Sequence, residues 1–291
     1  MRASAETRIG GDTHVVGIVG WPVAHSLSPA IHNAAFAESG LDWVYVPLPV
    51  QSQDLREALG GIAPLGFRGV NVTMPHKTEA AELIEHVSED ARILRAVNTI
   101  AVRGDELEGH NTDAPGFDRF LRRDAGFDPD GRTAIVFGAG GAARACSLAL
   151  ARAGLARLTV AARDEARAAP LVEMVHALDV PVAVVRPGDT GDLAADLVVN
   201  ATPVGGSGAE RAHASVPHLG PDVLVVDLLY DPPSTDLQHQ AREAGATVFG
   251  GLGHLLEQAA LSFELWTGMP APLEVMSAAA LAALSERSQV T

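Results

Sequence analysis

The sequence has one cysteine and no long apolar run, and both shortages exclude whole classes of protein. Cys146 alone cannot form an intrachain disulfide or a cysteine-rich metal site, and the histidines are not spaced as metal ligands, so we expect no bound metal. No apolar run reaches the roughly 18 residues that a membrane-spanning helix needs. The residues before Val15 are polar and lack the apolar region of a signal peptide. We therefore expect a protein of the reducing cytoplasm.

Positive charge is also scarce, since 21 Lys and Arg residues face 36 Asp and Glu residues, a net charge of −15. This balance disfavours nucleic acid and anionic membranes as partners. A few convergent N–H groups or one arginine can still bind a small anion, because salt screens the distant charges. With 291 residues, 47% of them hydrophobic, the chain can bury the core of one large domain or of two ordinary ones.

Short apolar strands alternate with helical patterns in the first part of the chain. The run THVVGIVG (13–20) is typical of a short buried strand, and VYVPLPV (44–50) and FRGVNVTMP (67–75) are typical of further strands. This alternation predicts a parallel or mixed sheet with helices on both faces, whose ligands lie at the carboxyl ends of the strands. We expect Ser26, Thr73 and Asn98 to lie in loops at such ends.

A second α/β domain is predicted from about residue 131 onward. A strand, a glycine turn, a helix and another strand follow one another within 133–164, and further apolar strands come after them. The segment GGSGAERAHAS (205–215) has the composition of a flexible loop. We place the domain boundary near Asp113 to Pro115, and we expect the helices from Gly253 onward to pack back on the first domain.

The glycine turn at 138–143 matches the G-x-G-x-x-G/A pattern of dinucleotide-binding folds. Gly138 permits the tight turn, Gly140 lets the backbone approach a pyrophosphate, and the small Ala143 lets helix and strand pack closely. The free N–H groups at the start of the helix attract negative charge. Because the pattern stands between a predicted strand and a predicted helix, it predicts a dinucleotide site.

Arg163 follows the next strand, about 25 residues beyond Gly138, where NADP enzymes place an arginine for the 2′-phosphate. A guanidinium forms two parallel hydrogen bonds to phosphate, and Arg167 lies one helical turn further on. Asp164 leaves other interpretations open, because its carboxylate could repel a phosphate or accept from the free 2′-OH of NAD. Arg163 and Asp164 could also be a solvated turn pair.

Four segments at predicted strand ends carry polar residues that a core does not need: 26–29, 71–77, 96–99 and 111–113. Each has an ordinary structural explanation, for example Ser28 with Pro29 as a helix cap, or Lys77 as an exposed lysine. Together they indicate one cleft for a polyhydroxylated ligand. In such a cleft hydroxyls and amides bind the ligand's hydroxyls, and a lysine and an aspartate move the proton.

These motifs together resemble the shikimate/quinate dehydrogenase family over nearly the whole chain. The family pattern S-x-S-P-x-x-H-N appears at 26–33, N-V-T-x-P-x-K at 71–77, A-V-N-T at 96–99, N-T-D at 111–113 and G-A-G-G-A at 138–142. Later matches are N-A-T-P at 200–203, Y-D-P at 230–232 with Thr235, and Q-A-A at 258–260 leading to Phe263, Trp266, Thr267 and Gly268.

The resemblance implies an α/β fold of two domains. Residues 1–113, with 251–291 packing back on them, would bind substrate, and residues 114–250 would form a Rossmann-like, doubly wound parallel-sheet domain for NADP. Lys77 and Asp113 would be the catalytic pair. The implied substrate-binding residues are Ser26 and Ser28 for a carboxylate, Thr73, Asn98 and Gln258 for ring hydroxyls, and Tyr230 near the carboxylate. The implied cofactor-binding residues are Gly138, Ala139, Gly140, Gly141, Ala142, Arg163, Arg167, Thr202 and Gly251.

The implied activity is the reversible, NADP-dependent reduction of 3-dehydroshikimate to shikimate in chorismate and aromatic amino acid biosynthesis, by a monomer or homodimer.

The sequence departs from the family's pattern at two places. The family's N-R-T-x-x-R segment for the 2′-phosphate reads A-R-D-E-A-R at 162–167. His254 stands where the family commonly has methionine, and we expect the His254 side chain to have a packing role and not a catalytic one. Because Asp164 is compatible with NAD, a quinate or dual-specificity dehydrogenase that uses NAD is an alternative function. Ser28 favours shikimate as the substrate. A sensing protein without catalysis is a further alternative, and Lys77 with Asp113 counts against it.

Overall fold

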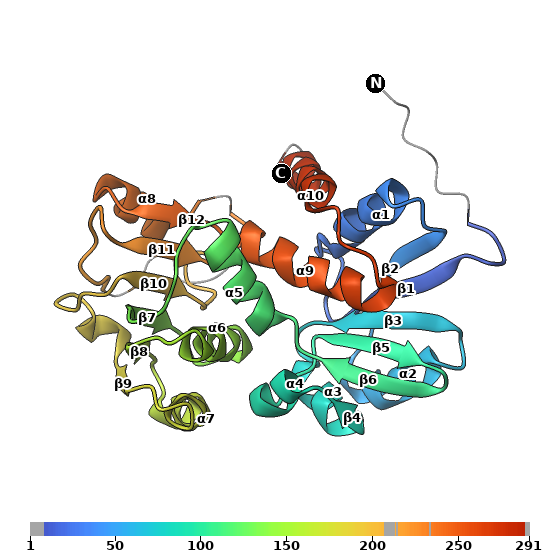
Figure 1. Cartoon of the computed structure of the whole chain (residues 1–291), viewed down its shortest axis with the longest axis horizontal. Helices are drawn as coiled ribbons and strands as arrows, with labels where there is room; N and C mark the ends of the chain where they lie inside the picture. Colours follow the sequence, from blue (N-terminus) through green and yellow to red (C-terminus); the bar gives the residue numbers. More distant parts are fainter. Residues whose placement is uncertain (1–8, 207–212, 214, 233, 289–291) are drawn as a thin grey trace. The chain divides into compact units, whose positions relative to one another are not determined.

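The computed structural model describes residues 9–206, 213, 215–232 and 234–288, which form two compact units (Figure 1). The first unit runs up to Thr112 and resumes at Leu256, and the second runs from Asp113 to Leu255. In the described residues each unit is built on a six-stranded sheet. Most of the segment 205–215, which we predict as a flexible loop, lies outside the described residues, as does the chain before Ile9.

The first unit has a mixed sheet in the order β2-β1-β3-β5-β6-β4. The strands are β1 His14–Gly20, β2 Trp43–Pro49, β3 Phe67–Val72, β4 His86–Val87, β5 Thr99–Arg103 and β6 Glu106–His110. The helices are α1 Ser28–Glu38, η1 Ser52–Asp54, α2 Leu55–Ile62, α3 Lys77–Leu83, α4 Glu89–Leu94, the part of α9 (Leu252–Thr267) from Leu256 onward, and α10 Leu273–Ser288. The predicted strand at 67–75 ends early, at Val72, because the chain turns at Thr73.

The prediction that Asn98 lies at the carboxyl end of a strand is wrong, because Asn98 precedes β5. This strand and β6 form a hairpin whose two-residue turn begins at Gly104, with φ of 63°. Since β5 runs antiparallel to β3, its amino end lies at the same sheet edge as the carboxyl end of β3. Thr73, Asn98 and Asn111 therefore reach one edge of the sheet from strands of both directions.

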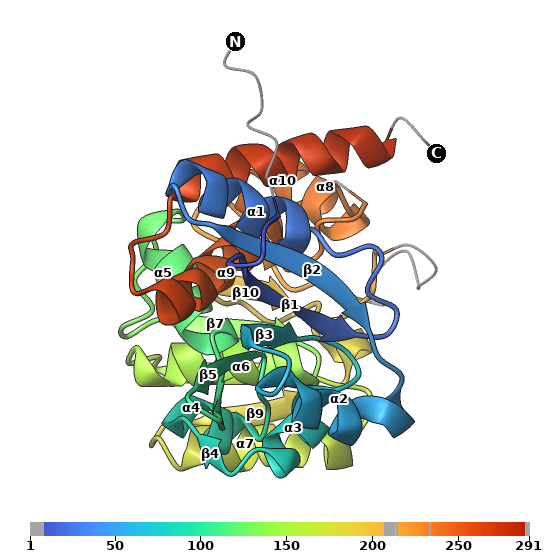
Figure 2. The same cartoon turned by 90° about the vertical axis from the view of Figure 1, so that its right-hand side faces the viewer.

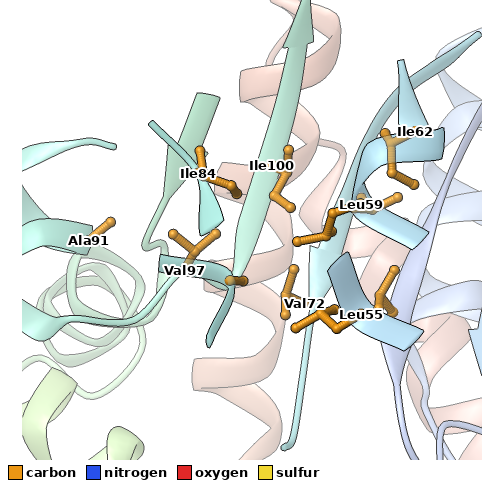
Figure 3. Packing of buried hydrophobic residues seen from close by; sticks show 11 residues of the cluster. Leu55, Leu59, Ile62, Val72, Ile84, Ala91, Val97 and Ile100 are labelled. Atoms are coloured by element: carbon orange, nitrogen blue, oxygen red, sulfur yellow. The ribbon is translucent and has the colours of Figure 1, made fainter. Parts of the chain in front are cut away.

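Side chains alternate between the two faces of this sheet, as the pleat of a strand requires. Val72 of β3 and Ile100 of β5 belong to a buried apolar cluster with residues of α2, α3 and α4 (Figure 3). Their neighbours Asn71 and Thr99 point to the opposite face, where both contact Ser262 of α9. On that face α10 lies along α1 (Figure 2). One face is thus apolar, and the other carries buried polar groups.

The second unit has a fully parallel sheet in the order β12-β11-β10-β7-β8-β9. The strands are β7 Thr133–Phe137, β8 Arg157–Ala161, β9 Val182–Val185, β10 Leu197–Asn200, β11 Leu224–Asp227 and β12 Thr247–Phe249. The helices are α5 Asp113–Arg123, α6 Gly141–Arg152, α7 Glu165–His176, η2 Pro187–Asp189, α8 Asp236–Glu243 and the start of α9. This order is that of a doubly wound Rossmann fold, so the predicted fold class is confirmed.

The order of the strands in the second sheet reverses at β7, which lies between β8 and β10. In doubly wound sheets ligands bind beyond the carboxyl ends of the strands at this point. The glycine turn follows β7 directly, and Thr202 follows β10. Among the helices of the described residues, none is both long and apolar enough for a membrane span.

Candidate functional site

The glycine turn at 138–140 connects β7 to α6 with almost no side-chain volume. Gly138 has φ of 108°, and a Cβ there would lie 3.0 Å from the Ala201 carbonyl oxygen, so the turn needs glycine. A Cβ on Gly140, the N-cap of α6, would meet no atom within 4 Å, which means that the protein leaves this space unfilled. Ala143 is fully buried where helix and strand meet. The start of α6 therefore presents free N–H groups to open space.

A cavity of about 710 Å³ lies beside this turn. Its described lining residues are Phe137, Gly138, Ala139, Gly140, Arg144, Ala161, Ala162, Arg163, Asp164, Arg167, Pro187, Gly188, Ala201, Thr202, Pro203, Val204 and His213. Six of the predicted cofactor residues are among them, whereas Gly141, Ala142 and Gly251 are not. Gly251 is buried against the backbone of Leu228, where a Cβ would collide. The size of the cavity, the glycine turn beside it and the arginines in its lining together fit a dinucleotide that carries a phosphate.

The arginines and the carboxylate at one end of the cavity are arranged around the start of α7. Asp164 is the N-cap of α7, and its Oδ1 accepts from the backbone N–H groups of Ala166 at 2.9 Å and Arg167 at 3.2 Å. These bonds and the helix dipole offset the charge of the carboxylate. Asp164 therefore opposes a phosphate less than a free carboxylate would, and Arg163 and Arg167 line the cavity on either side of it in sequence.

Thr202 is held in place by a buried network that the sequence did not reveal. Its hydroxyl donates to Asn200 Oδ1 at 2.7 Å, and Asn200 Nδ2 donates to Asp227 Oδ1 at 2.9 Å. Thr235 donates to the other oxygen of Asp227 at 2.6 Å. Burial raises the pKa of Asp227, and these hydrogen bonds lower it in part. Asn200 and Thr202 of the N-A-T-P motif thus share one network with Thr235, which positions a wall of the cavity.

Arg144 and His213 line the same cavity and were missed by sequence reasoning. Arg144 is the fourth residue of α6, and the only signal for it was its place one turn after Gly140. The ring of His213 lies against Phe137, with centroids 4.2 Å apart. His213 lies in a segment of flexible-loop composition, and nothing in that composition points to a ligand.

In the first unit, Asn98 lies at the centre of a second buried polar network. Its Oδ1 accepts from the backbone N–H of Thr112 at 2.8 Å, and its Nδ2 lies 2.9 Å from Thr112 Oγ1 and 3.5 Å from Gln258 Oε1. Asn71 Nδ2 lies within 3.2 Å of the Asn98 carbonyl, Thr99 Oγ1 and Ser262 Oγ. The structure thus brings together two predicted substrate residues, Asn98 and Gln258, which lie 160 residues apart in the chain.

Tyr45 extends this network toward the serine motif. Its hydroxyl donates to Asn71 Oδ1 at 2.8 Å and also has a hydrogen bond with Ser28. Burial raises the pKa of Tyr45 well above its usual range, and the bond with Ser28 opposes that rise in part. The His32 ring stacks on Tyr45 with centroids 4.5 Å apart and planes 2° from parallel. Burial lowers the pKa of His32 to about 3, so this imidazole is neutral.

The two serines are positioned by the loop between β1 and α1. The interpretation of Ser28 as a helix cap is wrong: Leu27 occupies the N-cap, and Ser28 is the first residue of α1, followed by Pro29 in the first turn. Ser26 Oγ accepts from the backbone N–H of Ser28 at 3.2 Å. Because that bond uses an oxygen lone pair, the Ser26 hydroxyl proton stays available to an acceptor such as a carboxylate.

The predicted catalytic pair stands at two helix starts. Lys77 is the first residue of α3, and its carbonyl accepts from Val97 N–H at 2.8 Å, which ties it to the turn before Asn98. Thr73 is half-buried in the turn between β3 and α3. In the second unit, Asp113 is the first residue of α5 and is 8% exposed.

Two further residues lie near the ends of elements in the second unit. Tyr230 is half-buried, three residues after β11. The His254 Nε2–H donates to the Asp113 carbonyl at 3.0 Å, and its ring packs edge-on against Phe117. His254 thus fixes the backbone of Asp113.

Comparison with known proteins places the chain. The family model described as shikimate dehydrogenase substrate binding domain matches residues 18–100, and the one described as shikimate 5′-dehydrogenase C-terminal domain matches residues 251–281. The shikimate dehydrogenase (NADP(+)) of Methanopyrus kandleri is 44% identical over 286 residues, which cover 96% of this chain and 98% of that protein. The chain belongs to the shikimate dehydrogenase family.

Solved structures of the shikimate dehydrogenase family have the same fold. A shikimate dehydrogenase in complex with NADP⁺ has a TM-score of 0.88 at 34% identity, covering 95% of this chain and 98% of that one. Shikimate 5-dehydrogenase from Thermus thermophilus, in complex with NADP(H) and shikimate, has a TM-score of 0.83 at 36% identity, covering 94% and 100%. The family resemblance predicted from the motifs is therefore confirmed.

Proposed function

We propose that this chain is an NADP-dependent shikimate dehydrogenase, which reversibly reduces 3-dehydroshikimate to shikimate in chorismate and aromatic amino acid biosynthesis. The observation that carries the proposal is the glycine-turn cavity with its two arginines in a chain that matches shikimate dehydrogenases (NADP(+)) over almost its whole length. In this proposal the oxidoreductase acts on a ring CH–OH group.

The residues of the cavity fit NADP as its cofactor. Gly138, Ala139 and Gly140 leave room for a pyrophosphate at the start of α6. Arg163 and Arg167 supply guanidinium groups for the 2′-phosphate, and the capping bonds of Asp164 reduce the repulsion that its carboxylate would cause. We also assign Gly141, Ala142, Thr202 and Gly251 to cofactor binding.

We assign the proton transfer to Lys77 and Asp113. When bound, NADPH supplies a hydride to the carbonyl carbon, so a side chain must supply the proton to the carbonyl oxygen. The ammonium of Lys77 can donate this proton or stabilise the developing alkoxide, and the carboxylate of Asp113 can orient both the lysine and a substrate hydroxyl. His254 supports this role by fixing the carbonyl of Asp113.

The remaining assignments concern the substrate. The hydroxyls of Ser26 and Ser28 donate to its carboxylate, with Tyr230 nearby, and Thr73, Asn98 and Gln258 bind its ring hydroxyls. The hydrogen bonds around Asn98 support this assignment, because they fix the direction of its amide. Residues 1–113 with 251–291 form the substrate domain in this proposal and 114–250 the NADP domain. The protein is cytoplasmic, and a monomer or homodimer.

The second candidate is a quinate or dual-specificity dehydrogenase that uses NAD, and one observation favours it: Asp164 also lines the cavity. Absorbance at the nicotinamide band, with purified protein and each combination of shikimate or quinate with NADP or NAD, separates the candidates. We expect the largest kcat/KM with shikimate and NADP. A larger value with quinate and NAD would support the second candidate, and no turnover in any combination would contradict both.

A further inference from the structure

The last turn of α10 holds the loop that carries the two serines. Arg287 Nη1 donates to the carbonyl of His25 at 2.9 Å, and Arg287 Nη2 donates to the carbonyl of Ser26 at 3.1 Å. Since α10 lies along α1 (Figure 2), the guanidinium reaches the loop just before α1 begins. One side chain thus holds two consecutive carbonyls in a fork, although it comes from 261 residues further along the chain.

This fork completes the restraint on Ser26. Its side-chain oxygen accepts from the Ser28 N–H, and its own carbonyl accepts from Arg287. With both groups fixed, the Ser26 oxygen has a defined position from which its hydroxyl can donate. The loop that carries Ser26 is therefore fixed before any ligand arrives, which reduces the entropy lost on binding.

Arg287 also brings a permanent positive charge to this loop. The chain carries a net charge of −15, which opposes the approach of an anion. A guanidinium bonded to the Ser26 carbonyl lies well within one Debye length of an anion held by the Ser26 hydroxyl, so salt screens their attraction only in part. The serine hydroxyls can form directional hydrogen bonds to a carboxylate but carry no charge. Arg287 supplies a positive charge near them.

We propose that Arg287 is a positioning residue for the substrate carboxylate: its fork fixes the serine loop and its charge favours the anion. This inference rests on the proposed function. Arg287 lies beyond residue 281, the last position that the family model matches. It acts through Ser26 and does not move the proton, so its effect falls on the KM for shikimate.

The alternative is a purely structural tie between a helix and a loop, and the chain offers a matched control. Arg103 donates Nη2 to the carbonyl of Leu265 at 3.0 Å, which is also a bond from an arginine to a backbone carbonyl in the same unit. Arg103 closes β5 and is remote in sequence from the serine loop. Replacing Arg103 with alanine tests how the loss of one bond from an arginine to a backbone carbonyl affects the kinetics and the thermal midpoint when the serine loop is intact.

The experiment measures kcat and both KM values for wild type, Arg287→Ala, Arg287→Lys and Arg103→Ala, with a thermal midpoint for each. We expect Arg287→Ala to raise the KM for shikimate roughly 5- to 20-fold, with kcat and the KM for NADP within about twofold of wild type. Arg287→Lys keeps the charge but not the fork, so we expect an intermediate KM. Added salt should narrow the gap between Arg287→Lys and Arg287→Ala. Arg103→Ala should leave the KM for shikimate unchanged.

An unchanged KM for shikimate in Arg287→Ala would overturn the inference. So would an equal rise in Arg103→Ala, or a fall in kcat and thermal midpoint without a specific rise in KM, because these results indicate a structural tie. A wild type that turns over none of the substrates would instead contradict the proposed function. The two failures are therefore distinguishable.

Discussion

Lys77 is the only lysine in the sequence; the other 20 of the 21 basic residues are arginines. Wherever a permanent surface charge suffices, this chain uses arginine. A guanidinium cannot release its proton in a protein, whereas an ammonium can. The one position that keeps an amine is the one to which we assign proton transfer, which is a chemical reason for the assignment that does not depend on the family.

Replacing Lys77 tests this reasoning directly. We expect Lys77→Ala to lower kcat by a factor on the order of 10² to 10⁴ with little change in the KM for shikimate. Lys77→Arg keeps the positive charge but lacks a transferable proton, so we expect it to stay slow as well. Steady-state kinetics of both variants provide the check. Near wild-type turnover in Lys77→Arg would mean that the lysine acts only as a charge.

His32 gives the first unit a defined pH dependence of stability. Neither of its ring nitrogens has a hydrogen-bond partner in the described part of the chain, and burial lowers its pKa from 6.5 to about 3. Below pH 6.5 the unfolded chain therefore binds a proton at His32 that the folded chain does not bind. The free energy of unfolding falls as pH falls through this window, by roughly 2 kcal/mol between pH 7 and pH 5 from this group.

Urea unfolding at pH 7 and pH 5 measures this effect. His32→Leu removes the titrating group, so we expect a shallower pH dependence in this variant whatever its stability at pH 7. His239, which lies on α8 in the second unit, provides the control: His239→Gln should keep the slope of the wild type. Parallel slopes for wild type and His32→Leu would show that another group is responsible.

At the scale of elements, the hairpin of β5 and β6 shows what sequence reasoning could and could not reach. The strands β1, β2 and β3 were predictable from their apolar runs, and β7 and α6 from the glycine turn. We placed Asn98 after a strand because α/β sequences favour parallel strands, yet β5 is antiparallel. Gly104-Asp105 between two short alternating segments is a hairpin signal that was present in the sequence.

Gly69 in β3 explains how α9 can cover the sheet so closely. A Cβ at this position would collide with the carbonyl of Ile100 and with Nε1 of Trp266, and that Nε1–H donates to the same carbonyl at 2.9 Å. We expect Gly69→Ala to lower the free energy of unfolding by roughly 2 to 4 kcal/mol, because it overpacks the core and breaks a buried hydrogen bond.

Gly60 in α2 is the matched control for Gly69. A Cβ there meets no atom within 4 Å, and the residue lies inside a helix. Gly60→Ala should therefore raise the free energy of unfolding by about 0.5 to 1 kcal/mol. Urea unfolding compares the two variants, and equal effects would contradict the packing argument at Gly69.

At the scale of the whole molecule, two compact units carry two separable sets of residues. Every described residue that lines the glycine-turn cavity belongs to the second unit, and the network of Asn98 belongs to the first. Mutations in the cavity should therefore affect the cofactor and leave the binding of shikimate almost unchanged.

The double variant Arg163→Ala with Arg167→Ala tests this separation. Each lost guanidinium removes charge-assisted hydrogen bonds to a 2′-phosphate, so we expect the KM for NADP to rise roughly 10²-fold. The KM for NAD and the KM for shikimate should stay within about twofold of wild type. An equal rise in the KM for NADP and the KM for NAD would mean that the arginines stabilise the cavity and do not bind the 2′-phosphate.

Contacts between residues that are far apart in the chain could not be predicted from the sequence. The glycine turn and Arg163 were predictable because their spacing along the chain is local. Arg287 with Ser26, and Asn71 with Ser262, meet across more than 190 residues, and no local pattern encodes such a pair. The capping role of Asp164 was also hidden, because the same residue in the same place fits both a helix cap and a ribose ligand.

The first unit is assembled from two separate segments of the chain, up to Thr112 and from Leu256 onward, whereas the second is continuous from Asp113 to Leu255. On the ribosome, residues 113–255 leave the exit tunnel before α10, so the Rossmann unit can complete its sheet while α1 still lacks the helix that lies along it. Arg287 is among the last described residues to emerge. The serine loop therefore acquires its final restraint only after the whole second unit has been synthesised, so the glycine-turn cavity can form before the serine loop is fixed.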